Sequence, residues 1–120
     1  MCDVALEKAK DLKLNVKYTC KVPGIFDMPL VIDKLLHKKE IDGIVVLGAV
    51  IKGQTKHDEV IANSTIRNIA KLSIKNQKPI SLGISGPGMT ERQAYARIRS
   101  VSENAVNAVI KVNNELKRIN

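Results

Sequence analysis

The spacing of apolar residues predicts a regular alternation of helices and strands. Residues 4–13 carry apolar side chains at helical spacing. Residues 15–22 alternate apolar and polar side chains one by one, which predicts a half-exposed strand at the edge of a sheet. A helix from Pro29 to about Lys39 follows, because proline suits the first turn of a helix.

The second half of the chain continues the same alternation. Residues 44–47 form an unbroken apolar run, which is typical of a parallel strand buried on both faces. A glycine-bearing loop leads to a helix over about 58–76. A strand over 80–84 then ends in a Ser-Gly-Pro-Gly sequence. The residues of the 58–76 helix that we expect to point inward are Val60, Ile61, Ile66, Ile69 and Ala70.

A capping box at Thr90 and Gln93 predicts that one final helix begins there and continues to about Lys117. The order helix, strand, helix, strand, helix, strand, helix implies a parallel sheet flanked by helices, that is, a three-layer α/β domain. A doubly wound sheet normally begins with a central strand before its first helix. We therefore expect the first strand to be missing from this chain, and residues 1–120 to form a single, N-terminally incomplete domain.

Composition and charge exclude several classes of function. A chain of 120 residues suits one domain, and no apolar run approaches the ~20 residues that span a bilayer. The net charge of +8 would attract nucleic acid, but the charge is scattered along helical faces and only 2% of the residues are aromatic. Because no export signal opens the chain, we expect a cytoplasmic protein with neither a membrane nor a nucleic-acid partner.

The sequence predicts no metal site and no cofactor. The two histidines and two cysteines are far apart and share no ligand spacing. Neither a Walker loop nor a dinucleotide-binding glycine pattern occurs. We expect Cys2 and Cys20 to be structural free thiols.

Three loops following strands are expected to meet at the carboxyl edge of the sheet, where open parallel sheets bind ligands. These loops are residues 23–27, 48–56 and 85–89. The middle loop places glycines, Gln and Thr before a helix N-terminus, where free N–H groups and the helix dipole favour a phosphate. His57 stands at the start of that helix as a candidate proton shuttle, the alternative being an ordinary exposed histidine.

The remaining candidates have structural alternatives. Asp27 is either a carboxylate that satisfies free N–H groups at a helix entry or an acceptor for ligand hydroxyls. Phe26 is more often core than ligand platform. Arg92 and Arg97, on the final helix, are either surface cations or arginines that reach back to grip a phosphate. We interpret His37, near the end of a helix, as structural.

Taken together, the three loops resemble a known family. Val22 to Pro29, Leu47 to His57, and Gly83 to Thr90 with Gln93, Ala94 and Arg97 are similar to the archaeal form of 6,7-dimethyl-8-ribityllumazine synthase. The resemblance covers essentially the whole chain and implies a flavodoxin-like fold. It also implies condensation of 5-amino-6-(D-ribitylamino)uracil with 3,4-dihydroxy-2-butanone 4-phosphate, the penultimate step of riboflavin biosynthesis, without a cofactor.

The resemblance also implies roles for individual residues. His57 corresponds to the catalytic histidine of the family, and Arg97 to the arginine that clamps the phosphate. The phosphate-contacting turn is Gly53, Gln54 and Thr55, and the residues that contact the pyrimidine and ribityl chain are Phe26, Asp27, Ala49, Val50 and Ile51. Leu82 and Ile84 fall on a segment that a neighbouring subunit contributes, since the family's active sites form between subunits of a homo-oligomeric pentamer that sometimes assembles into a capsid.

The chain departs from the family at its start. The family opens with a central strand whose terminal aromatic residue stacks on the pyrimidine, whereas this chain starts inside the helix that follows. We hypothesise that this form is inactive or weak and an extended form active, which equal turnover of the two would contradict. The alternatives are an archaeal riboflavin synthase, which shares the Val-Pro-Gly entry, and a non-enzymatic flavin- or lumazine-binding protein.

Overall fold

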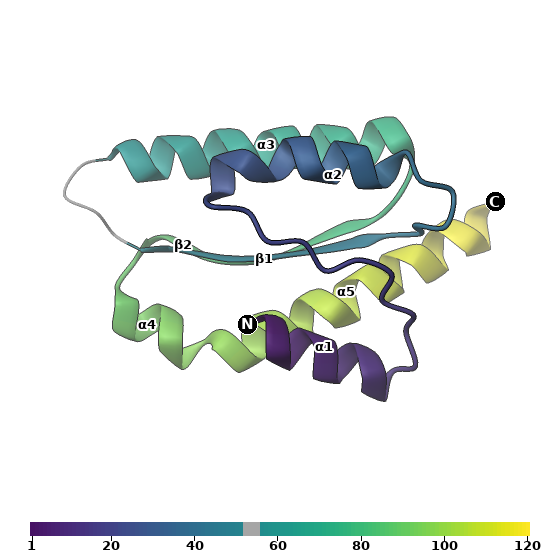
Figure 1. Ribbon diagram of the computed structural model, residues 1–120, viewed down its shortest axis with the longest axis horizontal. Helices are drawn as coiled ribbons and strands as arrows, with labels where there is room; N and C mark the ends of the chain where they lie inside the picture. The colour runs from purple at the N-terminus through teal and green to yellow at the C-terminus, as the bar shows by residue number, and fades with distance from the viewer. Residues whose placement is uncertain (52–55) are drawn as a thin grey trace.

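The computed structural model describes residues 1–51 and 56–120 (Figure 1). The predicted Gly53, Gln54 and Thr55 lie outside the described residues. The elements are α1 (Cys2–Asp11), the 3₁₀ turn η1 (Ile25–Asp27), α2 (Met28–Leu36), β1 (Ile44–Ile51), α3 (His57–Asn76), β2 (Ile80–Met89), α4 (Glu91–Ala96) and α5 (Ile98–Ile119). None of the helices in the described part of the chain is long and apolar enough to cross a membrane.

The described elements form three layers, with a sheet between two pairs of helices. β1 and β2 are parallel, in a register that pairs Ile44 with Ile80 and Ala49 with Ser85. Figure 1 shows α2 and α3 on one face of the sheet and α1 and α5 on the other. The predicted class, an α/β domain with a parallel sheet flanked by helices, is confirmed.

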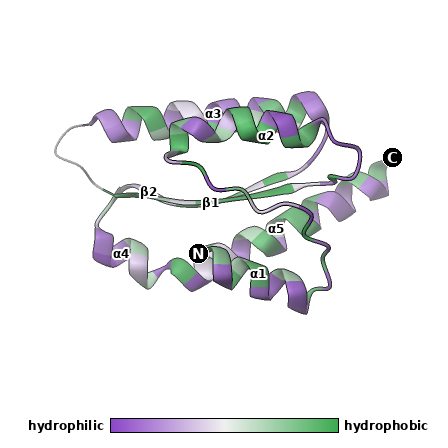
Figure 2. Cartoon of the chain, in the orientation of Figure 1, coloured by the Kyte–Doolittle hydropathy of each residue, from purple (hydrophilic) through white to green (hydrophobic). Residues whose placement is uncertain are grey.

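The apolar run in β1 places side chains in two separate cores. Val46 is buried in the first core together with Ile32 and Leu36 of α2 and Ile69 of α3. Successive side chains of a strand point to opposite faces, so Val45 and Leu47 pack instead against the second core. That core contains Ala5, Ala9 and Val106. In Figure 2 each helix carries both apolar and polar residues, as expected for helices that cover a sheet on one side only.

The predicted edge strand over residues 15–22 is wrong. The segment is extended, but in the described structure no backbone hydrogen bond joins it to another part of the chain. A hydrogen-bonded neighbour, and not alternation alone, makes a strand. Residues 15–22 run alongside a groove, described below, and therefore have no neighbour within hydrogen-bonding distance.

Part of the predicted inner face of α3 is also wrong. Ile69 is buried, and Ile61 and Ile66 are half-buried, but Val60 is 64% exposed and Ala70 is exposed as well. The fully covered positions are instead occupied by Ala62 and Thr65. The small residues let α3 approach its neighbours closely, whereas Val60 lies in the first turn of the helix.

Two boundaries differ from prediction at the end of the chain. β2 does not stop at Ile84 but continues to Met89. The expected single final helix is two helices, because Arg97 lies between α4 and α5 with φ −104° and ψ 3°. Both differences occur beside the carboxyl ends of the strands, where the candidate site lies.

Candidate functional site

The carboxyl ends of the two strands form the base of the candidate site. Ala49 pairs with Ser85 and Ile51 pairs with Met89, so Val50 stands opposite three residues of β2. Such a bulge bends a strand and re-aims its side chains. Ala49 and Ile51 are exposed and Val50 is half-buried, which leaves the predicted pyrimidine-lining segment accessible.

Gly86 brings the two strand ends into backbone contact. Its φ of +98° lies in the region that favours glycine, and a Cβ added there would come within 2.3 Å of the Val50 carbonyl oxygen. A side chain at this position would therefore push the two loops apart. Gly86, which was expected to follow the end of a strand, lies within β2. Its lack of a side chain lets the ends of β1 and β2 come into backbone contact.

His57 is the first residue of α3, as predicted, and it is exposed. Asp58 and Glu59 follow it in the first helical turn. The N-terminus of a helix has unpaired N–H groups and a positive partial charge, so a phosphate or other anion would be stabilised there. His57 thus lies at a helix N-terminus, the kind of position that favours an anion.

The 3₁₀ turn η1 carries Phe26 and Asp27 and contacts α3. The backbone N–H of Gly24 donates to Asp27 Oδ2 at 3.1 Å, so the carboxylate satisfies an N–H group where the chain enters η1 and α2. Phe26 is 74% exposed, and its interpretation as a core residue is wrong.

Arg97 lies at the junction of α4 and α5, with an exposed side chain. Its carbonyl oxygen accepts hydrogen bonds from Val101 N at 2.9 Å and Ser100 Oγ at 3.3 Å, which fixes the junction. The predicted capping box before it is confirmed: Thr90 N donates to Gln93 Oε1 at 2.9 Å, and Gln93 N donates to Thr90 Oγ1 at 3.2 Å. Since α4 contacts both strands, Arg97 is held on the side of the sheet's carboxyl end.

Leu82 and Ile84 do not join the other candidates. Leu82 pairs with Val46 in the middle of the sheet and is 40% exposed, while Ile84 packs against the first core. Within one chain they belong to the body of β2. The other candidates that the structure describes come from the ends of β1 and α3, from η1 and from the α4–α5 junction.

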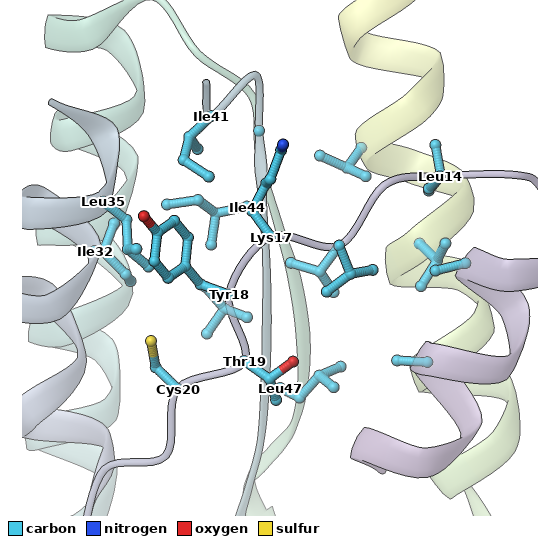
Figure 3. A pocket seen from close by; sticks show the side chains of 18 of the residues that line it. Leu14, Lys17, Tyr18, Thr19, Cys20, Ile32, Leu35, Ile41, Ile44 and Leu47 are labelled. Atoms are coloured by element: carbon cyan, nitrogen blue, oxygen red, sulfur yellow. The ribbon is translucent and has the colours of Figure 1, made fainter. Parts of the chain in front are cut away.

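Sequence reasoning expected a strand to be missing from the sheet but did not predict the large groove along the outer edge of β1 (Figure 3). The groove has a volume of about 710 Å³ and lies between β1 and the extended residues 15–22. In Figure 3 the side chain of Tyr18 points toward α2 and away from the α1 side. The signal that could have revealed it was the pairing of an alternating segment with an apolar run that no adjacent strand covers.

The chain is similar to known proteins along almost its entire length. The family described as 6,7-dimethyl-8-ribityllumazine synthase matches residues 1–117. A relative of that name from Saccharolobus islandicus (strain L.S.2.15 / Lassen #1) is 51% identical over 119 residues, which are 99% of this chain and 77% of the relative. A relative of the same name from Saccharolobus solfataricus is 53% identical, and the match covers 93% of this chain and 73% of the relative. One from Methanocaldococcus jannaschii is 47% identical, covering 97% and 82%.

Proposed function

The chain belongs to the 6,7-dimethyl-8-ribityllumazine synthase family, and from that membership we propose which residues perform the condensation. The family makes 6,7-dimethyl-8-ribityllumazine in riboflavin biosynthesis, a transferase reaction. The substrates are 5-amino-6-(D-ribitylamino)uracil and 3,4-dihydroxy-2-butanone 4-phosphate. The observation that carries the residue assignment is that His57 at the start of α3, the exposed end of β1, and Arg97 after α4 all stand on segments that follow the carboxyl ends of the two strands.

The pyrimidine substrate is placed against the end of β1. Ala49, Val50 and Ile51 offer backbone groups and apolar side chains at the bulge, and Phe26 offers a ring face from η1. Asp27 is exposed, and a carboxylate there would accept hydrogen bonds from the ribityl hydroxyls. Positioning of this kind supplies much of the rate in a condensation, because two reactants must meet in one orientation.

The phosphate of the second substrate is placed between Arg97 and the start of α3. The N-terminus of α3 attracts an anion, and a guanidinium binds phosphate through two parallel N–H groups. Gly53, Gln54 and Thr55 immediately precede this end of the helix in sequence. The contacts that hold the phosphate would also stabilise it as the leaving group in the elimination step.

The proton transfers are assigned to His57. Imine formation, phosphate elimination and ring closure each require protons to move, and a histidine at neutral pH can accept one and return it. No nucleophilic side chain and no cofactor enters this scheme. The reaction then depends on orientation and on one proton shuttle.

The proposed site is completed by assembly. On its own chain Leu82 pairs with Val46 in the middle of the sheet, and the side chain of Ile84 packs against the first core. Their assignment to substrate binding therefore needs a neighbouring subunit, as in a homo-oligomeric pentamer or a capsid of pentamers, located in the cytoplasm. Leu82, 40% exposed on its own chain, is available for such a contact.

The experiment is a steady-state absorbance assay of lumazine formation from the two named substrates. His57→Ala is expected to lower kcat by about 100-fold, the size of a general acid–base contribution. Arg97→Ala is expected to raise KM for the butanone phosphate by about tenfold, since it removes a charge-assisted contact. The matched controls are His37→Ala, at the far end of α2, and Arg99→Ala, whose side chain pairs with Glu103 at 3.8 Å.

The two alternatives give different results in the same assay. A riboflavin synthase would consume lumazine and release a flavin, which absorbs at longer wavelength. A non-enzymatic binding protein would bind flavin or lumazine equally well with His57 replaced, because no proton transfer is needed. Equal kcat for His57→Ala and wild type would contradict the assignment of the proton shuttle.

A further inference from the structure

The turn between α3 and β2 is held by hydrogen bonds to its own backbone. Ser73 Oγ donates to the carbonyl oxygen of Lys78 at 2.7 Å, and the N–H of Lys78 donates to the carbonyl oxygen of Ser73 at 3.3 Å. Gln77 ends the helix in the left-handed conformation, with φ 53°, and its Nε2 donates to the carbonyl oxygen of Ile74 at 2.7 Å. These bonds fix the backbone of Lys78 just before β2 begins.

The side chain of Lys78 crosses from this turn to the end of α2. Its Nζ donates to the carbonyl oxygen of Leu36 at 2.8 Å and to that of Lys38 at 2.9 Å. Leu36 is the last residue of α2, and the final carbonyl oxygens of a helix have no partner within it. A positive charge is also stabilised there by the helix dipole. Lys78 therefore caps α2 from a turn far along the chain.

A neighbouring lysine shows that this contact is specific to Lys78. Figure 1 shows α2 and α3 ending at the same end of the molecule. Lys75 lies in the last turn of α3, but it is exposed, and within residues 1–51 and 56–120 it has no hydrogen bond or ion pair. Lys78, in contrast, is half-buried. A lysine at this end of the molecule does not bind the end of α2 merely by being near it.

The other end of α2 carries part of the proposed substrate site. The turn η1 passes directly into α2 at Met28, which has helical dihedral angles of φ −65° and ψ −44°. Phe26 and Asp27 are therefore attached to the beginning of the helix whose end is held by Lys78. The nine residues of α2 form a rod of ~14 Å. A shift or rotation at Leu36 is thus passed on to η1.

Side-chain packing covers only one side of α2. Ile32 and Leu36 are buried in the first core, whereas Leu30, on the outer side, is 80% exposed. Apolar contacts are not directional, but hydrogen bonds weaken steeply when their angle changes. The two bonds from Lys78 at the end of the helix are therefore the contacts best placed to resist sliding or rotation of α2.

We propose that Lys78 is a positioning residue of the proposed active site, which sets where Phe26 and Asp27 stand relative to the end of β1 by holding the far end of α2. This inference rests on the proposed function, in which Phe26 and Asp27 contact the pyrimidine substrate. The effect is selective for that substrate, because Arg97 and His57 stand on other elements. Since η1 also contacts α3, loss of the Lys78 bonds displaces the two residues without releasing them.

The test compares Lys78→Met with wild type by calorimetry on the full chain. Methionine removes the ammonium, while the bonds to Ser73 remain because they use the backbone of residue 78. The Kd of 5-amino-6-(D-ribitylamino)uracil is expected to rise by about fivefold or more, since small misplacements of binding groups are costly. The Kd of inorganic phosphate is expected to stay within about twofold, because a guanidinium and the start of α3 bind it. In the steady-state assay the KM values of the two substrates should diverge in the same way.

Two further variants separate positioning from stability and from charge. Lys78→Arg again offers N–H donors to the two carbonyl oxygens, and its Kd for the pyrimidine is expected to return to within about twofold of wild type. Lys75→Met removes the same charge from the end of α3 and is expected to leave both Kd values unchanged. Partial unfolding would lower the binding stoichiometry and the apparent kcat but not change Kd. If Lys78→Met does not fold, Lys78→Gln takes its place, with the same selective rise expected.

Two results would overturn the inference. The first is an unchanged Kd for the pyrimidine in Lys78→Met, and the second is an equal rise in the Kd values of pyrimidine and phosphate. Failure of the proposed function is seen separately, in wild type. A wild-type chain that binds the pyrimidine without forming lumazine would contradict the catalytic roles alone, and the comparison of Kd values would still decide the role of Lys78. A wild-type chain that does not bind the pyrimidine would contradict both.

Discussion

The two edges of β1 present the same backbone to very different surroundings. On one edge β2 lies in parallel register, from Ile44 opposite Ile80 to Ala49 opposite Ser85. On the other edge the nearest extended segment, residues 15–22, stands across a groove of about 710 Å³. The pattern of residues 15–22 is the more regular alternation of the two, yet only β2 is a strand.

The comparison of the two edges shows that the close approach of two backbones, and not the alternation of side chains along a segment, decides whether two segments pair as strands. A side chain at Gly86 would meet the Val50 carbonyl of β1, and one at Gly83 would meet Leu47 of β1 and Ala105 of α5, so both glycines let β2 pack closely against its neighbours. Residues 15–22 are held instead by contacts of Tyr18 with Glu40 and Lys38, at the level of the α2–β1 loop. One neighbour is fixed by backbone and packing, the other by exposed side chains.

The largest effect is expected on the paired edge. A Cβ at Gly83 would lie 2.7 Å from Leu47 Cδ2, 3.0 Å from Ala105 Cβ and 3.2 Å from Val46 O. Gly83→Ala should therefore lower the free energy of unfolding by about 1–3 kcal/mol, as overpacking does. Urea denaturation followed by circular dichroism measures the change.

Gly24→Ala is the matched control for Gly83→Ala. A Cβ at Gly24 meets only Asp27 Oδ2, at 3.5 Å, and φ there is −153°, which any residue adopts. The expected change is within about 0.5 kcal/mol. Equal losses for the two variants would mean that the close packing around Gly83 does not limit stability.

A smaller effect is expected on the unpaired edge. Tyr18→Phe removes the hydrogen bond to Glu40 but keeps the ring beneath Lys38, and the loss of stability should be about 0.5 kcal/mol. Tyr95→Phe, on a tyrosine that is 78% exposed, should change nothing measurable by the same denaturation curves. A loss of several kcal/mol for Tyr18→Phe would show that this contact supports more than a surface segment.

The smallest effect is expected in the pH dependence of that same contact. A backbone hydrogen bond to the Glu40 carboxylate lowers its pKa below the ordinary value of 4.5, with further lowering by Tyr18, Lys38 and Lys17. A lowered folded-state pKa contributes stability above the unfolded value, and that contribution is lost as the pH falls through the folded pKa. The melting temperatures of wild type and Glu40→Gln should therefore converge as the pH falls from 7 to below 4.5. A constant difference over this range would contradict the assignment.

The sequence predicted the elements whose signals are local. The Thr90–Gln93 capping box, the helix opened by Pro29 and His57 at the start of α3 were each predicted, because a cap, a fixed φ or a short apolar run acts over a few residues. The break at Arg97 was not predicted. No residue between Glu91 and Ile98 is a helix breaker, so contacts of α4 with the strands are the remaining cause.

The sequence by itself determined the α/β class, the order of the elements between residues 28 and 89, and the family, since periodicity and motifs are carried by neighbouring residues. The tertiary structure alone decided that Val60 is exposed, that Phe26 lies on the surface, and that residues 15–22 have no strand to pair with. These properties depend on which segments, far apart in the sequence, pack against one another in the folded chain. An alternating segment becomes a strand only when another backbone stands at hydrogen-bonding distance, and in this structure a groove occupies that place.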